Sequence, residues 1–95
     1  MSENDFASKV ERAFVQIIEE RAALNFKKGE FAAKVWPEMS PKAAASRWTS
    51  IRIKASNTGK PQAVSIADAQ RMATVIGKDL SYFMVIAAER ASGQK

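Results

Sequence analysis

Two prolines, Pro37 and Pro41, fix the place where two helices of this chain must meet. Proline lacks an amide N–H and its ring clashes with the preceding helical turn, so a helix that reaches Pro37 must end there. Pro41 instead suits the first position of a helix, where a missing N–H costs nothing, and Ser40 is a favourable N-cap before it. The sequence therefore predicts one helix ending near Trp36, a short turn, and a new helix from Pro41.

Apolar residues recur at steps of three and four along most of the chain, which is the pattern of amphipathic helices. The expected helices cover roughly residues 5–24, 28–36, 41–53 and 66–76, with a fifth from residue 80, and 55–63 is the one sizeable loop. Ser65 and Asp79 are predicted N-caps, and Gly77 is a predicted helix stop. The expected fold is all-α, a compact bundle of about five helices in one domain over residues 5–90, with frayed tails at 1–4 and 91–95.

The expected core combines the inward faces of these five helices. Its predicted members are Phe6, Val10, Phe14, Ile17, Ile18, Leu24, Phe31, Ala32, Val35, Trp36, Ala44, Ala45, Trp48, Ile51, Ile66, Ala69, Met72, Ala73, Ile76, Leu80, Phe83, Met84 and Ala87. The two tryptophans follow the helical period, so we expect both in the core rather than on a surface that stacks against bases.

The absence of two residue types excludes whole classes of function. With no cysteine and no histidine, the chain has neither the usual zinc ligands nor a Cys-His or Ser-His catalytic pair. It also has no glycine-rich phosphate loop and no cluster of carboxylates, so we expect no enzyme, no metal and no cofactor. No apolar run approaches the ~20 residues that cross a bilayer, and the polar start is unlike a leader peptide. We expect a cytoplasmic, nucleoid-associated protein without membrane contact.

The net charge of +5 is concentrated in the middle of the chain. Residues 1–38 hold six basic and seven acidic side chains, residues 39–67 hold five basic and none acidic, and residues 68–95 hold four and three. Solvated charge on helical proteins usually alternates in sign, so a block of one sign predicts a binding face for a polyanion. The second helix after the turn lies in this block, and a basic helix of small residues after a tight turn is typical of a helix-turn-helix that enters the DNA major groove.

Three runs of the sequence, EFAAKVW, AASRW and RMATVIGKDLSYFM, resemble the lambda-repressor-like or XRE-type helix-turn-helix regulators. The resemblance covers roughly residues 14–86, although the turn before the third helix is longer here. It implies a sequence-specific regulator that binds double-stranded DNA, of the bacterial or phage repressor type. In that family the residues that contact bases fall at Lys42, Ala43 and Arg47, and the residue that opens the second helix, here Lys28, contacts a phosphate.

The predicted DNA interface extends beyond these positions. We expect backbone contacts from Lys27, Lys28, Ser40, Ser46, Ser50, Arg52, Lys54 and Lys60, because cationic and hydroxyl side chains bind phosphates. A merely solvated position is an equally good interpretation of Arg47.

Tyr82, Val85 and Ile86 form either ordinary surface or a dimer seam. We favour the seam, since one helix-turn-helix unit makes few contacts and a homodimer on a palindromic operator doubles them. A protein-interaction or antitoxin-like module on the same scaffold is the alternative function.

Overall fold

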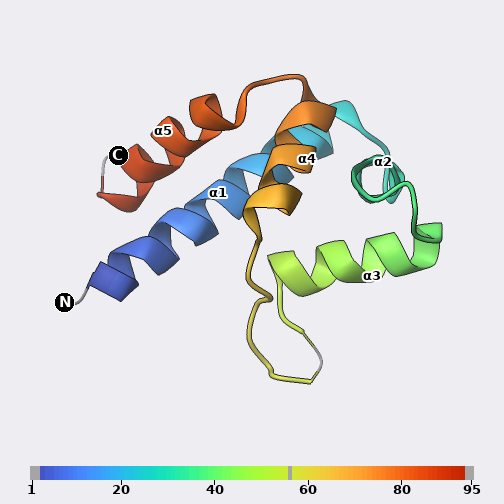
Figure 1. Ribbon diagram of the computed structural model, residues 1–95, viewed down its shortest axis with the longest axis horizontal. Helices are drawn as coiled ribbons and strands as arrows, with labels where there is room; N and C mark the ends of the chain where they lie inside the picture. Colours follow the sequence, from blue (N-terminus) through green and yellow to red (C-terminus); the bar gives the residue numbers. More distant parts are fainter. Residues whose placement is uncertain (1–2, 56, 94–95) are drawn as a thin grey trace.

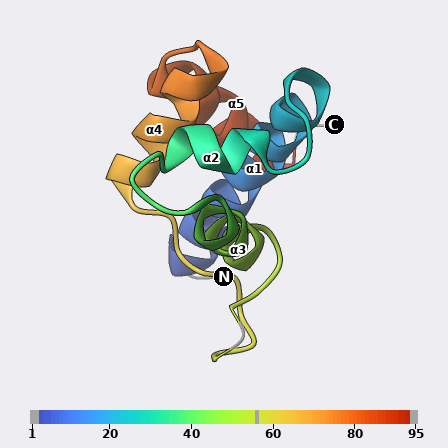
Figure 2. The same ribbon diagram turned by 90° about the vertical axis from the view of Figure 1, so that its right-hand side faces the viewer.

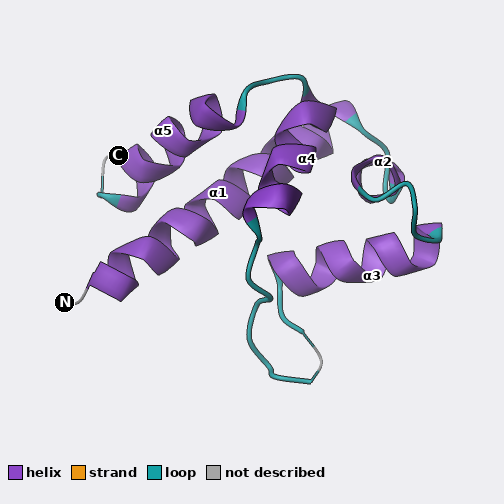
Figure 3. Ribbon diagram, in the orientation of Figure 1, coloured by secondary structure: helices purple, strands orange, loops and turns teal. Residues whose placement is uncertain are grey.

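The computed structural model describes residues 3–55 and 57–93, and over these residues the chain forms five helices and no strand (Figures 1 and 3). The helices are α1 (Glu3–Asn25), α2 (Glu30–Val35), α3 (Pro41–Arg52), α4 (Ile66–Ile76) and α5 (Leu80–Ala91). The prediction of an all-α bundle of about five helices is confirmed. Helix also covers residues 3, 4 and 91, which were expected to fray, while 1, 2, 94 and 95 lie outside the described residues. None of the described helices is long and apolar enough to cross a membrane.

The long helix α1 is the support on which α3, α4 and α5 pack, and α2 packs on α3 and α4. Helix α5 lies along it, and their contact includes the edge-to-face rings of Phe14 and Phe83, whose centroids are 6.4 Å apart. Helix α4 contacts both, whereas α2 and α3 pack together at one end of the molecule (Figure 1). The largest fully buried side chains come one from each helix, so all five helices contribute to the centre of one core: Ile18, Val35, Ile51, Met72 and Phe83.

Local chemistry sets most helix boundaries where the sequence predicted them. The Ser40 hydroxyl accepts the Ala43 amide at 3.2 Å, and the Ser65 hydroxyl accepts the Asp68 amide at 3.0 Å, so both serines are N-caps. Gly77 ends α4 at φ 95°, a left-handed conformation that glycine adopts without a steric penalty. Asp79 occupies the N-cap position of α5, but its carboxylate accepts no capping hydrogen bond.

Helix α2 is shorter than the sequence indicated. The prediction began this helix at Lys28, whereas Gly29 precedes it with φ 83° and the helix starts at Glu30. The Glu30 carboxylate accepts the backbone N–H of Lys27 at 2.9 Å, so the turn before α2 is held by a side chain of the helix itself. Lys27 and Lys28 therefore lie in the turn.

Four predicted core residues lie at the surface instead. The exposed fraction is 82% for Leu24, 81% for Ile66, 46% for Phe6 and 37% for Met84. Leu24 is two positions past the buried Ala22, and at 3.6 residues per turn this step places it on the opposite side of α1. Ile66 opens α4, and together with Met84 it borders an apolar groove that no described residue fills.

Candidate nucleic-acid interface

Helix α3 is anchored in the core by one large ring. Trp48 is only 9% exposed and packs against Phe31 of α2, with 5.2 Å between ring centroids. Ala44 and Ile51 on the same side are fully buried, so the predicted inward face of α3 is confirmed for these three residues. Trp36, the C-cap residue of α2, is 2% exposed and therefore lies in the core, as predicted. The opposite side of α3 is thereby left for solvent or a partner.

The loop after α3 extends the same side of the molecule (Figures 1 and 2). Both ends of this loop are tied to α1. Arg12 of α1 donates to the carbonyl of Ile51 at 2.7 Å, near the end of α3, and Glu11 accepts the backbone N–H of Val64 at 2.7 Å, near the start of α4. The backbone N–H of Gln62 also donates to the Ser50 carbonyl at 2.9 Å, which ties the loop to the last turn of α3. The loop therefore projects beside α3 from a fixed base.

The lysines of this region are the free cations of the structure. Their side chains are exposed, and within residues 3–55 and 57–93 they have no hydrogen-bond, ion-pair or aromatic partner: Lys27, Lys28, Lys34, Lys42, Lys54 and Lys60. All six arginines, in contrast, make contacts within the protein, and four of them pair with a carboxylate on another helix or in the turn before α3. The positive charge available to a polyanion is therefore lysine charge, and Lys42, Lys54 and Lys60 are at α3 or in the loop that follows it.

Arg47 lies differently from the prediction that it points away from the protein. Its NH2 donates to the carboxylate of Asp68 on α4 at 2.7 Å, and its guanidinium stacks 5.3 Å from the ring of Trp36. The Nε of Arg47 is buried and has no acceptor among the described residues. The hydrogen bond from NH2 to Asp68 is therefore the main polar interaction that offsets the burial of this guanidinium. Both expectations for Arg47, a base contact and a solvated position, assume a side chain directed outward, whereas this long side chain folds back onto α4.

Asp68 joins three helices through one carboxylate. The residue is 7% exposed, and besides Arg47 it accepts the Nε1–H of Trp36, the C-cap residue of α2, at 3.0 Å. Burial acts to raise the pKa of Asp68, but the hydrogen bonds from Arg47 and Trp36 outweigh it and hold this pKa below its ordinary value. Asp68 is therefore a buried anion that fixes the end of α2 and the middle of α3 against α4.

Some of the other residues predicted to contact DNA already have partners within the protein, and others do not. Arg52 donates to Glu19 at 3.3 Å and its guanidinium lies 5.5 Å from the Trp48 ring, so it braces α3 against α1. The Ser40 hydroxyl caps α3, and the Ser50 hydroxyl donates to the Ser46 carbonyl at 3.1 Å. The Ser46 hydroxyl is exposed and has no partner among the residues described.

Sequence reasoning missed the two groups that hold this interface in place. Neither Asp68 nor the pair Glu11 and Arg12 is among the residues that the sequence predicted for this region. One signal existed for Asp68, because it is the first acidic residue after the acid-free block of residues 39–67. For Glu11 and Arg12 the pattern of the sequence holds no sign of the loop that they clamp.

Comparisons of the chain with protein-family models, curated proteins and solved structures found no match. The geometry of its own residues therefore carries the functional inference. The described residues also contain no group of three or more acidic side chains that could hold a metal ion.

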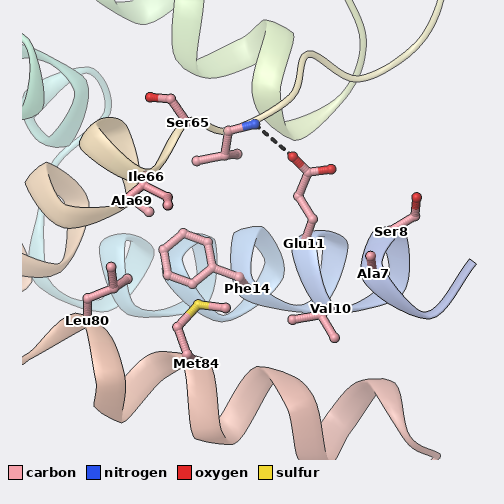
Figure 4. Close-up of a pocket in the computed structure, with 11 residues that line it drawn as sticks. Ala7, Ser8, Val10, Glu11, Phe14, Ser65, Ile66, Ala69, Leu80 and Met84 are labelled. Carbon is pink, nitrogen blue, oxygen red and sulfur yellow. Dashed lines mark hydrogen bonds between the residues drawn. The ribbon is translucent and has the colours of Figure 1, made fainter. Parts of the chain in front are cut away.

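A second surface feature lies between α1, α4 and α5. It is a groove of about 520 Å³ with apolar walls, and the Phe14 ring lies at its centre between the helices, with Leu80 at one edge (Figure 4). Two of its polar side chains are already used, since Glu11 accepts the Val64 backbone N–H and Ser65 caps α4. This groove has the character of a contact surface for an apolar group.

Part of the predicted dimer seam on α5 already makes contacts within the protein. The Tyr82 hydroxyl accepts from Arg21 at 3.2 Å, and the ammonium of Lys78 lies 5.3 Å from its ring. Val85 is 60% exposed, whereas Ile86 is half-buried against the core. Val85 therefore has the largest exposed fraction of the three.

Proposed function

We propose that this protein is a sequence-specific regulator of transcription that binds double-stranded DNA, of the bacterial or phage repressor type, and reads the major groove with α3. The observation that carries the proposal is the acid-free side of α3 and its loop, where Lys42, Lys54 and Lys60 are exposed and free of internal partners. Free lysines bind phosphates by releasing condensed counterions, which supplies affinity for any duplex.

The arrangement of α2, the turn at residues 36–40 and α3 supports a helix-turn-helix mode of binding. An α-helix fits the width of the major groove, and residues near the start of the recognition helix reach base edges. Ser40 and Pro41 define that start, so Lys42 and Ala43 stand in the first turn of α3. Lys54 and Lys60 then lie where they can bind the flanking phosphates.

A homodimer on a palindromic operator completes this proposal, with a cytoplasmic, nucleoid-associated location. Helix α5 supports the dimer because its sequence, LSYFMVIAAERA, has few polar residues for a helix at the surface. Val85 is the exposed anchor of the seam, flanked by Tyr82 and Ile86. Pairing of two copies would double the contacts that one α3 makes.

A mobility-shift titration of a random-sequence duplex at two salt concentrations tests DNA binding. We expect binding at low salt that weakens as salt rises, because each neutralised phosphate releases a counterion. Lys54→Ala should weaken binding, whereas Lys78→Ala, which removes the same charge at the turn before α5, is the matched control and should not. Absence of any shift at low salt, or a shift without salt dependence, contradicts the proposal.

The second candidate is a protein-interaction or antitoxin-like module, and the groove between α1, α4 and α5 favours it. Ile66 and Met84 border that groove with uncovered apolar area, as in contact surfaces for protein partners. Stable co-purification with one protein, lost in Ile66→Lys and accompanied by indifference to DNA, would support this function over the first.

A further inference from the structure

The polar groups on the outer side of α3 can be accounted for one by one. Arg47 is held by Asp68, and the hydroxyls of Ser40 and Ser50 are used within the helix. The Thr49 hydroxyl accepts from Arg52 at 3.3 Å. These groups are engaged within the protein before any ligand arrives, which removes most of the side chains that could read a base.

Three residues of α3 remain available at its outer side. Lys42 is exposed and its ammonium has no partner among the described residues, Ala43 presents a half-exposed methyl group, and Ser46 has an unused hydroxyl. Lys42 and Ala43 stand in the first turn of the helix, where recognition helices contact base edges. Among the described residues, Lys42 is thus the single charged donor still available in the first turn of α3.

Arg47 could not replace Lys42 without a cost that the geometry makes clear. To reach a base, its guanidinium would have to leave the Asp68 carboxylate at 2.7 Å and the Trp36 ring. Asp68 is largely buried, so its charge would lose its strongest partner in a place where little water can replace it. Arg47 therefore cannot contact a base while it holds α3 against α4 through Asp68.

The hydrogen-bonding groups at the base edges then indicate which base Lys42 prefers. In the major groove guanine presents two acceptors, O6 and N7, whereas adenine presents one acceptor beside a donor, and lysine has donors only. We infer that α3 selects guanine through Lys42, and that Arg47 is a positioning residue that contacts no base. The methyl of Ala43 favours a thymine, through its C5-methyl group, beside that guanine. This inference rests on the proposed function and extends it to the sequence that is read.

Selection of bound duplexes from a random pool, followed by titration of the consensus, tests the assignment. The wild type should select one guanine in each half-site, and replacing that guanine should weaken binding about 5- to 150-fold. Lys42→Ala should lose this discrimination, and Lys42→Gln should shift the preference toward adenine, because glutamine binds adenine N6 and N7. Replacing the guanine by 7-deazaguanine, which lacks the N7 acceptor, should weaken the wild type but not Lys42→Ala.

Two further variants separate reading from positioning. Arg47→Gln keeps a hydrogen-bond donor for Asp68 and should leave the selected consensus unchanged, whereas an arginine that bound guanine would shift its preference toward adenine when replaced by glutamine. Lys54→Ala is the control for lost charge and should weaken all sequences alike.

The inference is overturned if Lys42→Ala retains the guanine preference, or if Arg47→Gln shifts that preference to adenine. If the wild type retains no duplex from the pool, the proposed function fails and this inference with it. Duplex binding without a dependence on Lys42 rejects the inference alone.

Discussion

Replacing Asp68 by asparagine removes the charge that Arg47 and Trp36 share while leaving the size of the side chain almost unchanged. The Asp68 side chain is 10% exposed and that of Arg47 is 35% exposed, so the pair is neither fully buried nor fully screened by water. Removing one partner of a fully buried pair costs 3–5 kcal/mol, whereas a hydrogen bond to a charged group contributes about 1.5–3 kcal/mol. The asparagine oxygen can still accept one of the two hydrogen bonds, so we expect a loss of about 2 kcal/mol in the free energy of unfolding.

Urea unfolding followed by tryptophan fluorescence measures this loss, and a thermal scan should show a midpoint lowered by about 8–16 °C. Asp79→Asn is the matched control, because Asp79 is the same residue type next to a helix start but its carboxylate accepts no capping hydrogen bond. It should change stability by no more than about 0.5 kcal/mol. Equal effects of the two variants, or a stable Asp68→Asn protein, would refute the role given to this carboxylate.

Three more predictions follow from other features of the structure. Because the pKa of Asp68 is lower in the folded than in the unfolded protein, its contribution is present above about pH 4 and lost as pH falls through the folded value, so urea midpoints of wild type and Asp68→Asn should converge at acidic pH. Gly77→Ala forces φ 95° on a residue with a Cβ and should lower the unfolding free energy by about 1 kcal/mol in the same urea assay, and an unchanged midpoint would contradict this. Val85→Glu places charge on the exposed centre of the α5 seam and should shift a dimer to monomer in analytical ultracentrifugation, whereas a wild type that is already monomeric would reject the seam.

The parts of the fold that could be predicted from the sequence are those that local chemistry determines. Ser40 and Pro41 begin a helix whatever surrounds them, because the cap and the fixed φ act within one turn. Gly77 ends a helix for an equally local reason. Trp48 was placed in the core because the helical period already fixes its side of α3.

The parts that failed depend on contacts between distant segments. Leu24 and Ile66 fit an apolar pattern, yet whether an apolar residue is covered depends on which helix packs beside it. The Arg47 side chain meets a partner 21 positions away, and no spacing rule within α3 contains that information. For the interface, sequence reasoning found the charged region but could not separate the cations that are free from those that the protein itself uses.

The separation between Asp68 and Lys42 has a consequence for how such a protein could change over generations. Asp68 and Arg47 hold α3 against α4, and replacing either one alone weakens the fold. Substitutions at these two positions are therefore tolerated only when both change together. Lys42 is exposed and its side chain has no partner among the described residues, so its replacement leaves the packing of α3 against α4 intact. A new operator preference could therefore arise in one mutational step at the first turn of α3, without passing through an unstable ancestor.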